Sequence, residues 1–351
     1  MILSSAILEI NLKNLSYNYK YLKKLNNNFE TAATIKANAY GLGDKKIMQT
    51  LYKAGCKHFF VATLNEAINL RKTNKLGKIY ILNGISKKPN FNLKKLKIIP
   101  IVNSISNLNK LNKNNRYTEF GIHFDTGINR LGLNNSKLNN KFNKNLILIM
   151  SHYASADEIK NKYNSFQYNQ FLRIIKNYDH KILKSLNNSA GLSNKNKLFQ
   201  DLARPGISLY GGHNKTIIKK KIKPVIKLKA EVLQIKNLSK NQYVGYNQTF
   251  KTKRNIKIAI VGIGYADGVS RSLSNKGYLY YKNMKFKIIG RISMDTITID
   301  ITKSKIKIKT GMFLDIINYK YDIENMANKC STISNEILTS ISNRVERVYI
   351  K

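Results

Sequence analysis

The sequence predicts an α/β protein with an N-terminal (β/α)8 TIM-like barrel over residues 1–224 and a mainly β domain over residues 225–351. Eight short apolar segments recur in the first part with helical patterns between them, and this alternation is typical of a closed parallel barrel. Beyond residue 225 the strand patterns follow one another across turns with little helix between them. This change of pattern indicates the domain boundary.

The first helix is predicted close to the N-terminus. Asn11 is a suitable N-cap, and Leu12, Leu15, Tyr19 and Leu22 recur at helical spacing on one face. The segment is therefore expected to be an amphipathic helix.

The barrel strands are predicted from eight apolar, β-prone segments. They span residues 31–37, 58–63, 79–84, 97–103, 121–126, 146–152, 184–190 and 203–211. Helical patterns lie between them at residues 45–55, 65–73, 105–113 and 164–178. An open doubly wound sheet is the alternative, but eight such units in so short a stretch favour a closed barrel.

The second domain is predicted from alternating or apolar strand patterns separated by turns. They span residues 225–236, 257–268, 277–290 and 295–302. A short helix near residues 335–343 and a last strand at residues 347–351 complete the chain.

The composition allows two interpretations of the charge. The chain has 351 residues, 42% of them hydrophobic, and a formal net charge of +43. Lysine and arginine neutralise phosphates, so binding of nucleic acid or an anionic membrane is one interpretation. A bias toward Lys, Asn, Ile and Tyr, as in an AT-rich genome, is the other. Because the basic residues are spread along the chain, we favour the compositional bias and expect no specific nucleic-acid partner.

Cysteine usage and the N-terminus predict a cytoplasmic protein without a metal site. Cys56 and Cys330 are far apart and lack metal-ligand spacing, which suits a reducing compartment. The first apolar stretch has no basic residue before it and is interrupted by Glu9. No apolar run approaches the ~20 residues of a membrane span, so we expect no membrane association.

Reactive side chains gather at the predicted carboxyl ends of the barrel strands, where barrel active sites lie. Lys36 ends the first strand, His123 and Asp125 end the fifth with Arg130 just beyond, and His152 ends the sixth. Each has a simpler alternative: a solvated lysine, structural histidines, and an aspartate that caps the following turn.

The last two strands add groups suited to a phosphate. Strand seven runs into Asn188 and Ser189, and strand eight offers Arg204 and the backbone amides of Gly206 and Ile207. Phosphate often binds after strands seven and eight of such barrels. A lysine, arginines and a phosphate-binding turn on one rim point to a phosphorylated cofactor held covalently through the lysine.

Eight segments identify a resemblance over nearly the whole chain. In order along residues 7–350 they are KANAYG, FDTGINRLG, SHYASADE, NSAG, ARPGISLYG, VGIGYADG, GRISMD and NEILTSISNRVERVY. This ordered set resembles the signature segments of the alanine racemase family. The resemblance implies a TIM-like barrel followed by a β-rich domain, with the strand at residues 6–10 joining the C-terminal domain.

The resemblance also implies a reaction: interconversion of L- and D-alanine with pyridoxal 5'-phosphate, which supplies D-alanine for peptidoglycan. Lys36 is similar to the lysine that binds the cofactor covalently and later acts as a base. Tyr265 is similar to the base on the opposite face of the substrate Cα, supplied by the second subunit of a homodimer with shared active sites. Two bases are expected because one group cannot easily reach both faces of a carbon.

Four positions match those that hold the cofactor phosphate, and they are Tyr40, Ser189, Gly206 and Ile207. Asn188 belongs to the same cofactor-binding segment.

Further positions match groups around the cofactor ring and the substrate. Arg204 would donate to the pyridine nitrogen; because arginine hardly gives up its proton, it should leave that nitrogen unprotonated and favour clean proton exchange. Arg130 would contact the cofactor phenolic oxygen and the substrate, and His152 would bridge Arg204 and Tyr265. The backbone of the partner subunit's Met294 would meet the substrate carboxylate.

Two positions depart from the family pattern. His123 stands where the family commonly has a lysine, often carbamylated, that braces the arginine matching Arg130; His123 itself or a bound anion would then orient Arg130. Asn335, just before Glu336, stands where many members have a phosphate-binding tyrosine. Neither departure removes a base, so we expect tuned activity, not its loss.

Three alternatives remain. The chain could racemise a broader range of amino acids, or it could be a barrel-type pyridoxal-phosphate decarboxylase, although those enzymes typically place an acidic residue where Arg204 stands. From a different class, a polyanion-binding protein or a decayed racemase would bind nucleic acid in a strongly salt-dependent way.

Overall fold

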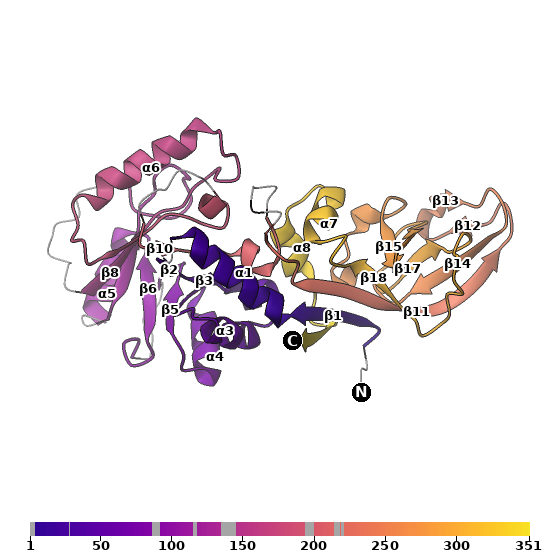
Figure 1. Cartoon of the computed structure of the whole chain (residues 1–351), viewed down its shortest axis with the longest axis horizontal. Coiled ribbons are helices and arrows are strands. Elements are labelled where there is room, and N and C mark those ends of the chain that lie inside the picture. The colour runs from indigo at the N-terminus through magenta and orange to yellow at the C-terminus, as the bar shows by residue number, and fades with distance from the viewer. Residues whose placement is uncertain are drawn as a thin grey trace. The chain divides into compact units, whose positions relative to one another are not determined.

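The computed structural model describes residues 4–27, 29–85, 92–114, 118–134, 145–193, 200–213, 218 and 221–351 (Figure 1). The chain divides into two compact units. The first comprises Leu15–Leu209 with His213–Lys223, and the second comprises Met1–Asn14, Tyr210–Gly212 and Pro224–Lys351.

The larger unit contains parallel strands in chain order. The first strand is broken into β2 (Glu30–Thr31) and β3 (Ala33–Thr34). The others are β4 (His58–Val61), β5 (Lys78–Ile81), β6 (Ile98–Val102), β7 (Phe120–His123), β8 (Leu146–Met150), β9 (Leu183–Ser185) and β10 (Leu202–Ala203). β3 to β9 form one sheet with each strand beside the next.

Backbone hydrogen bonds close this sheet into a barrel. β10 pairs in parallel with β2. The Asp201 amide donates to the Lys184 carbonyl oxygen at 2.9 Å, and the Arg204 amide donates to the Asn187 carbonyl oxygen at 2.9 Å, which joins β10 to the segment of β9. The predicted barrel is confirmed, and the open sheet is wrong, because the first and last strands share hydrogen bonds.

Helices alternate with these strands as predicted. They are α1 (Leu12–Leu25), α3 (Asp44–Lys53), α4 (Leu64–Thr73), α5 (Ile105–Asn114) and α6 (Lys162–Ile175). The Asn11 side chain accepts from the Asn14 amide at 2.7 Å, so the predicted cap of α1 is present. The apolar face of this helix, which includes Leu15, Tyr19 and Leu22, is fully buried.

Side chains fill the barrel interior. One buried cluster draws on several strands and consists of Ala32, Phe60, Tyr80, Ile99, Ile101, Leu148, Met150 and Leu202. Complete burial of side chains of this size contributes ~1.5–3 kcal/mol each. Because such an interior is packed and not a pore, a ligand is bound at one end of the barrel.

The smaller unit is built on a sheet with the order β16-β15-β18-β11-β1-β19. Its strands are β1 (Ala6–Asn11), β11 (Ile226–Leu238), β15 (Tyr278–Tyr281), β16 (Met284–Lys287), β18 (Phe313–Ile317) and β19 (Glu346–Ile350). β1 pairs antiparallel with β11 and parallel with β19. The N-terminal strand is therefore part of the β-rich unit.

The long strand β11 connects a second set of strands. Beyond a bulge near Val232 it pairs with β14 (Ile256–Val261), which in turn pairs with β17 (Ile297–Asp300). A hairpin of β12 (Tyr243–Val244) and β13 (Phe250–Lys251) precedes them. Short 3-10 turns occur at Gly191–Ser193, Ile207–Tyr210, Tyr246–Gln248, Tyr265–Asp267 and Arg271–Leu273.

Sequence patterns missed part of this unit. The predicted C-terminal helix is α8 (Ser334–Ser340), but β18, the β12–β13 hairpin and α7 (Ile323–Cys330) were not anticipated. Asp322 caps α7 by accepting from the Asn325 amide at 3.0 Å, a signal that the sequence does carry. No helix in the described ranges is long and apolar enough to cross a membrane.

Candidate active site

Lys36 begins an unusual turn at the carboxyl end of the first barrel strand. This turn, α2 (Lys36–Tyr40), is left-handed: the four residues after Lys36 all have φ between 52° and 56°. Left-handed backbone costs ~1–2 kcal/mol for each residue with a side chain. Strain of this kind persists only where the surroundings hold it, and it is common at functional sites.

Glu66 supports the turn from the start of α4. Its carboxylate accepts from the Ala37 amide at 2.7 Å, and also from the amides of Ala62 and Thr63 at 2.7 and 3.0 Å. Thr63 completes a capping box by accepting from the Glu66 amide. One carboxylate therefore fixes both the helix start and the backbone next to Lys36.

The amine of Lys36 is set up as a base or nucleophile. Partial burial lowers the pKa of Lys36, the nearby positive charge of Arg130 lowers it further, and Glu66 opposes these effects. A lowered pKa increases the fraction of neutral amine, the form that attacks a carbonyl or removes a proton.

Arg204 is a buried cation at the end of β10, with 5% of its surface exposed. Its guanidinium donates to the Ser151 carbonyl oxygen at 2.6 Å and to the Ser185 hydroxyl, which lie after β8 and at the end of β9. Burial lowers the pKa of Arg204 to about 9, so the side chain stays charged at neutral pH. Two neighbouring strands thus hold a fixed positive charge in the rim.

Two histidines lie near this charge and are kept neutral. Burial, followed by the charges of Arg204 and Arg130, holds the pKa of His152 well below its usual range. Burial and Arg204 likewise lower the pKa of His123 to about 4. Both imidazoles are therefore uncharged at neutral pH and can accept a hydrogen bond through one ring nitrogen.

A tight turn after β10 forms a polar cradle. The buried Ser189 hydroxyl oxygen accepts from the amides of Gly206 and Ser208 at 2.9 and 3.2 Å. A Cβ added to Gly206 would lie 2.3 Å from the Tyr40 hydroxyl oxygen, so only glycine lets the backbone approach that phenol. Tyr40, Ser189, Gly206 and the buried Ile207 therefore converge at one place.

The cradle fits a phosphate group. The Ser208 hydroxyl is buried in the same turn and has no hydrogen-bond partner among the described residues. A buried hydroxyl without a partner costs ~1–3 kcal/mol, which a ligand oxygen would recover. Hydroxyls and backbone amides are the groups that bind phosphate in such turns.

Asn188 and Asp125 also organise backbone turns. The Asn188 side chain accepts from the Gly191 amide at 2.9 Å. Asp125 accepts from the amides of Gly127 and Asn129 at 2.8 and 3.2 Å, so the predicted cap of this turn is confirmed.

Arg130 lies on an exposed loop after β7. The loop folds back on its strand, because the Leu133 amide donates to the His123 carbonyl oxygen at 2.8 Å. The charge of Arg130 contributes to the lowered pKa of Lys36 and of His123, which places it within electrostatic range of both.

Tyr265 and Met294 lie side by side in the smaller unit. The Tyr265 amide donates to the Ser293 carbonyl oxygen and the Ala266 amide to the Met294 carbonyl oxygen, both at 3.1 Å. A Cβ on Gly264 would lie 2.2 Å from the Met294 carbonyl oxygen, so the glycine permits this approach. Both side chains are exposed, Tyr265 at 44% and Met294 at 52%.

The second departure, Asn335, lies in α8 and is partly buried. Its carbonyl oxygen accepts from the Thr339 hydroxyl at 2.9 Å, an interaction within the helix. The adjacent Glu336 accepts from the Thr332 hydroxyl.

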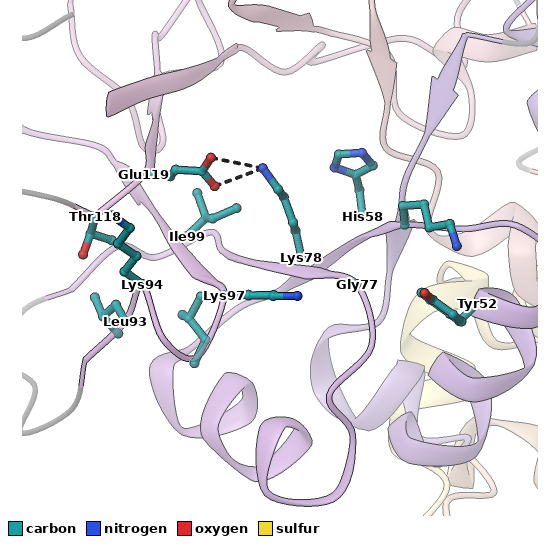
Figure 2. A pocket seen from close by; sticks show the side chains of 12 residues that line it. Tyr52, His58, Gly77, Lys78, Leu93, Lys94, Lys97, Ile99, Thr118 and Glu119 are labelled. Carbon is teal, nitrogen blue, oxygen red and sulfur yellow. Dashed lines mark hydrogen bonds and ion pairs between the residues drawn. The ribbon is translucent and has the colours of Figure 1, made fainter. Parts of the chain in front are cut away.

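A separate cavity of about 480 Å³ lies at the amino ends of β4 to β7, the ends opposite those that carry Lys36 and His123. Figure 2 shows Lys78 bound to Glu119 at its edge, an ion pair of 3.0 Å, with Lys94 and Lys97 nearby. Because it lies at the other ends of the strands, this cavity is not the candidate active site.

Sequence reasoning missed the residues that support the site. Glu66 could have been found, because Thr63-Leu-Asn-Glu66 is a capping-box pattern. Ser151 and Ser185 could not, because nothing in a local pattern shows which side chain meets a guanidinium from another strand. No cluster of three or more possible metal ligands occurs in the ranges that the structure describes.

The fold and the rim site define a TIM-barrel protein with a lysine-centred site and a β-rich second unit. Residues 10–214 match the model of the alanine racemase N-terminal domain, and residues 225–349 match that of the alanine racemase C-terminal domain. The chain therefore belongs to the alanine racemase family.

Individual relatives agree with this assignment. The alanine racemase of Rickettsia akari is 36% identical over 366 residues, which cover 99% of this chain and 100% of the relative. That of Brucella abortus is 35% identical over 376 residues, which cover 99% and 94%. The crystal structure of alanine racemase from Bartonella henselae, with covalently bound pyridoxal phosphate, matches with a TM-score of 0.92 and 35% identity over 98% of this chain and 99% of the other.

Proposed function

We propose that this chain is an alanine racemase that interconverts L- and D-alanine with pyridoxal 5'-phosphate. The observation that carries the proposal is Lys36, which has a lowered pKa and lies on the same barrel rim as the buried Arg204 and the polar cradle. Family membership over nearly the whole chain supports it. When bound, pyridoxal phosphate supplies an electron sink that makes the substrate Cα acidic.

Lys36 holds the cofactor and moves a proton at one face of the substrate Cα. Its position next to a fixed left-handed turn limits where the amine can point. Tyr40, Ser189, Gly206 and Ile207 bind the phosphate, and Asn188 shapes the adjacent turn. Arg204 would hold the ring nitrogen of the cofactor. Because its side chain stays charged at neutral pH, it would not deliver a proton there, which would favour racemisation over decarboxylation.

Tyr265 moves the proton at the opposite face. The exposure of Tyr265 and Met294 suits groups that meet a second subunit, so we propose a homodimer with shared sites. His152 then orients the phenol, Arg130 contacts the ligand oxygens, and the Met294 backbone meets the substrate carboxylate. We place the enzyme in the cytoplasm, with D-alanine for peptidoglycan as its product.

The decisive experiment is incubation of purified protein with L-alanine and pyridoxal phosphate, followed by chiral analysis. We expect a yellow protein and a product that approaches equal amounts of L- and D-alanine. Borohydride should fix the cofactor to a peptide that contains Lys36, and Lys36→Ala should take up no label. A label on another peptide, or no D-alanine, would overturn the proposal.

Shared sites are tested by mixing inactive subunits. Lys36→Ala and Tyr265→Phe proteins, each nearly inactive alone, should regain part of the activity when their subunits exchange. Tagged subunits verify the exchange, and no recovery despite exchange would mean that each chain holds a complete site.

A further inference from the structure

His123 and Asn103 form a buried pair on neighbouring strands of the barrel. His123 is the last residue of β7, and Asn103 directly follows β6. His123 Nδ1 lies 3.0 Å from Asn103 Oδ1, and the two residues are only 4% and 7% exposed. Because both side chains are buried, each of their polar atoms is expected to have a hydrogen-bond partner.

The amide of Asn103 has one possible orientation. Its Nδ2 donates to the Leu82 carbonyl oxygen at 2.8 Å and to the Ile101 carbonyl oxygen at 3.2 Å. A flipped amide would set an oxygen against two carbonyl oxygens, so Oδ1 must face His123. Because Oδ1 only accepts, His123 Nδ1 carries the proton.

The opposite ring nitrogen is then an acceptor without a donor. His123 Nε2 is buried and has no hydrogen-bond partner among the described residues. Two cations, Arg204 and Arg130, and one carboxylate, Asp125, lie within electrostatic range of the ring. The carboxylate is engaged by backbone amides of its own turn, so the surroundings favour the neutral ring. An unmet acceptor costs ~1–3 kcal/mol and implies an incoming donor.

One of the two arginines is free to be that donor. Arg204 is held by Ser151 and Ser185. Arg130 is exposed on its loop, and no side chain among the described residues pairs with it. Its long side chain can therefore turn toward the rim when a ligand binds.

We propose that Asn103 fixes His123 as a neutral acceptor, and that His123 Nε2 receives the Arg130 guanidinium in the cofactor-loaded enzyme. His123 and Asn103 are thus positioning residues for the reaction, and the inference rests on the proposed function. Because Nε2 offers a lone pair and no proton, the neutral ring accepts from Arg130 without an intervening anion, and Arg130 keeps its full charge for ligand oxygens.

A double-mutant cycle tests this inference. Asn103→Asp places a carboxylate against Nδ1, which stabilises the doubly protonated ring and turns Nε2 into a donor that repels Arg130. Its second oxygen replaces the donor to the Leu82 and Ile101 carbonyl oxygens, so the variant also loses stability and is assayed at a temperature where circular dichroism shows it to be folded. We expect about a tenfold weaker affinity for pyridoxal phosphate and about a tenfold lower kcat at pH 7. Both should recover as rising pH removes the ring proton, and neither loss should recur in an Arg130→Ala background. The full loss in that background would overturn the proposal.

A second measurement needs neither turnover nor a variant. Nitrogen-15 NMR of histidine-labelled, cofactor-loaded protein should show neutral His123 with the proton on Nδ1 at pH 7. A proton on Nε2 overturns the inference, as does a cofactor affinity that depends on chloride over gluconate. For the double-mutant cycle above, the matched control is His58→Gln, which removes a histidine bound to Tyr80 at the amino end of β4 and should leave kcat unchanged. If D-alanine is never formed, the proposed function fails, while the NMR result still decides the tautomer.

Discussion

The barrel rim and the Tyr265–Met294 segment solve the placement of reactive groups in different ways. On the rim, Arg204 and His123 are buried, and their side chains are held by bonds from neighbouring strands. In the smaller unit, backbone bonds hold Tyr265 and Met294 while their side chains stay exposed. Substitutions in the barrel site should therefore change both activity and stability, whereas substitutions of the exposed side chains should change activity alone.

The largest expected effect comes from Tyr265→Phe. Loss of a general base lowers kcat by about 10²–10⁴-fold, while the melting temperature should change little, because the side chain is exposed in its own subunit and the variant loses only a contact across the proposed dimer. Exchange of Cα-deuterium should be impaired more for L-alanine than for D-alanine. Equal impairment of exchange for L- and D-alanine would contradict the two-base assignment. A large drop in melting temperature would contradict the view that the Tyr265–Met294 segment contributes to activity and not to stability.

The burial of His123 in the barrel rim should make the stability of the protein depend on pH. Folding lowers the pKa of His123 from its unfolded value to about 4, so below pH ~6.5 the unfolded chain binds a proton that the native state rejects. The stability from the neutral ring is complete above that value and is lost as pH falls to about 4. It amounts to roughly 3 kcal/mol.

Urea unfolding at pH 7, 5 and 4 measures this contribution. The wild-type protein should lose roughly 3 kcal/mol more than His123→Gln over this range. An equal loss in both would show that His123 titrates normally and that the rim does not impose its protonation state.

Gly206→Ala tests the closeness of the cradle. The new Cβ would lie 2.3 Å from the Tyr40 hydroxyl oxygen, so we expect a destabilisation of ~1–3 kcal/mol and weaker cofactor binding. The double variant Tyr40→Phe with Gly206→Ala removes the clashing oxygen. It should recover most of the stability, but its affinity for the cofactor should stay low. Thermal melts and cofactor titrations measure the two effects, and no recovery would place the clash elsewhere.

Glu66→Ala should destabilise the protein to a similar extent. It leaves the Ala37 amide next to Lys36 without its acceptor and should cost ~1–3 kcal/mol. Glu119→Ala, which removes a half-exposed ion pair with Lys78, is the control and should cost less than ~1 kcal/mol. Equal costs in denaturant unfolding would mean that the left-handed turn needs no support from α4.

The fold could be predicted from local patterns because the hydrophobic pattern within each barrel strand and helix indicates which of its residues are buried. The prediction was weakest in the smaller unit, where β18 pairs with β11, which is distant in the chain, and each strand of the β12–β13 hairpin has only two residues. α7 was missed although its cap is visible, because its apolar face covers only two turns.

The sequence by itself determined the barrel, the second β-rich unit and the order of the candidate groups along the rim, since hydrophobic period and strand-end position are local properties. Only the tertiary structure decided which groups support them: the carboxylate of Glu66 under the strained turn, the serines on Arg204, and the orientation of Asn103 behind His123. The physical reason is that a hydrogen bond between strands depends on distance and direction in space. A chain separation of 20 residues, as between Asn103 and His123, carries no trace of either.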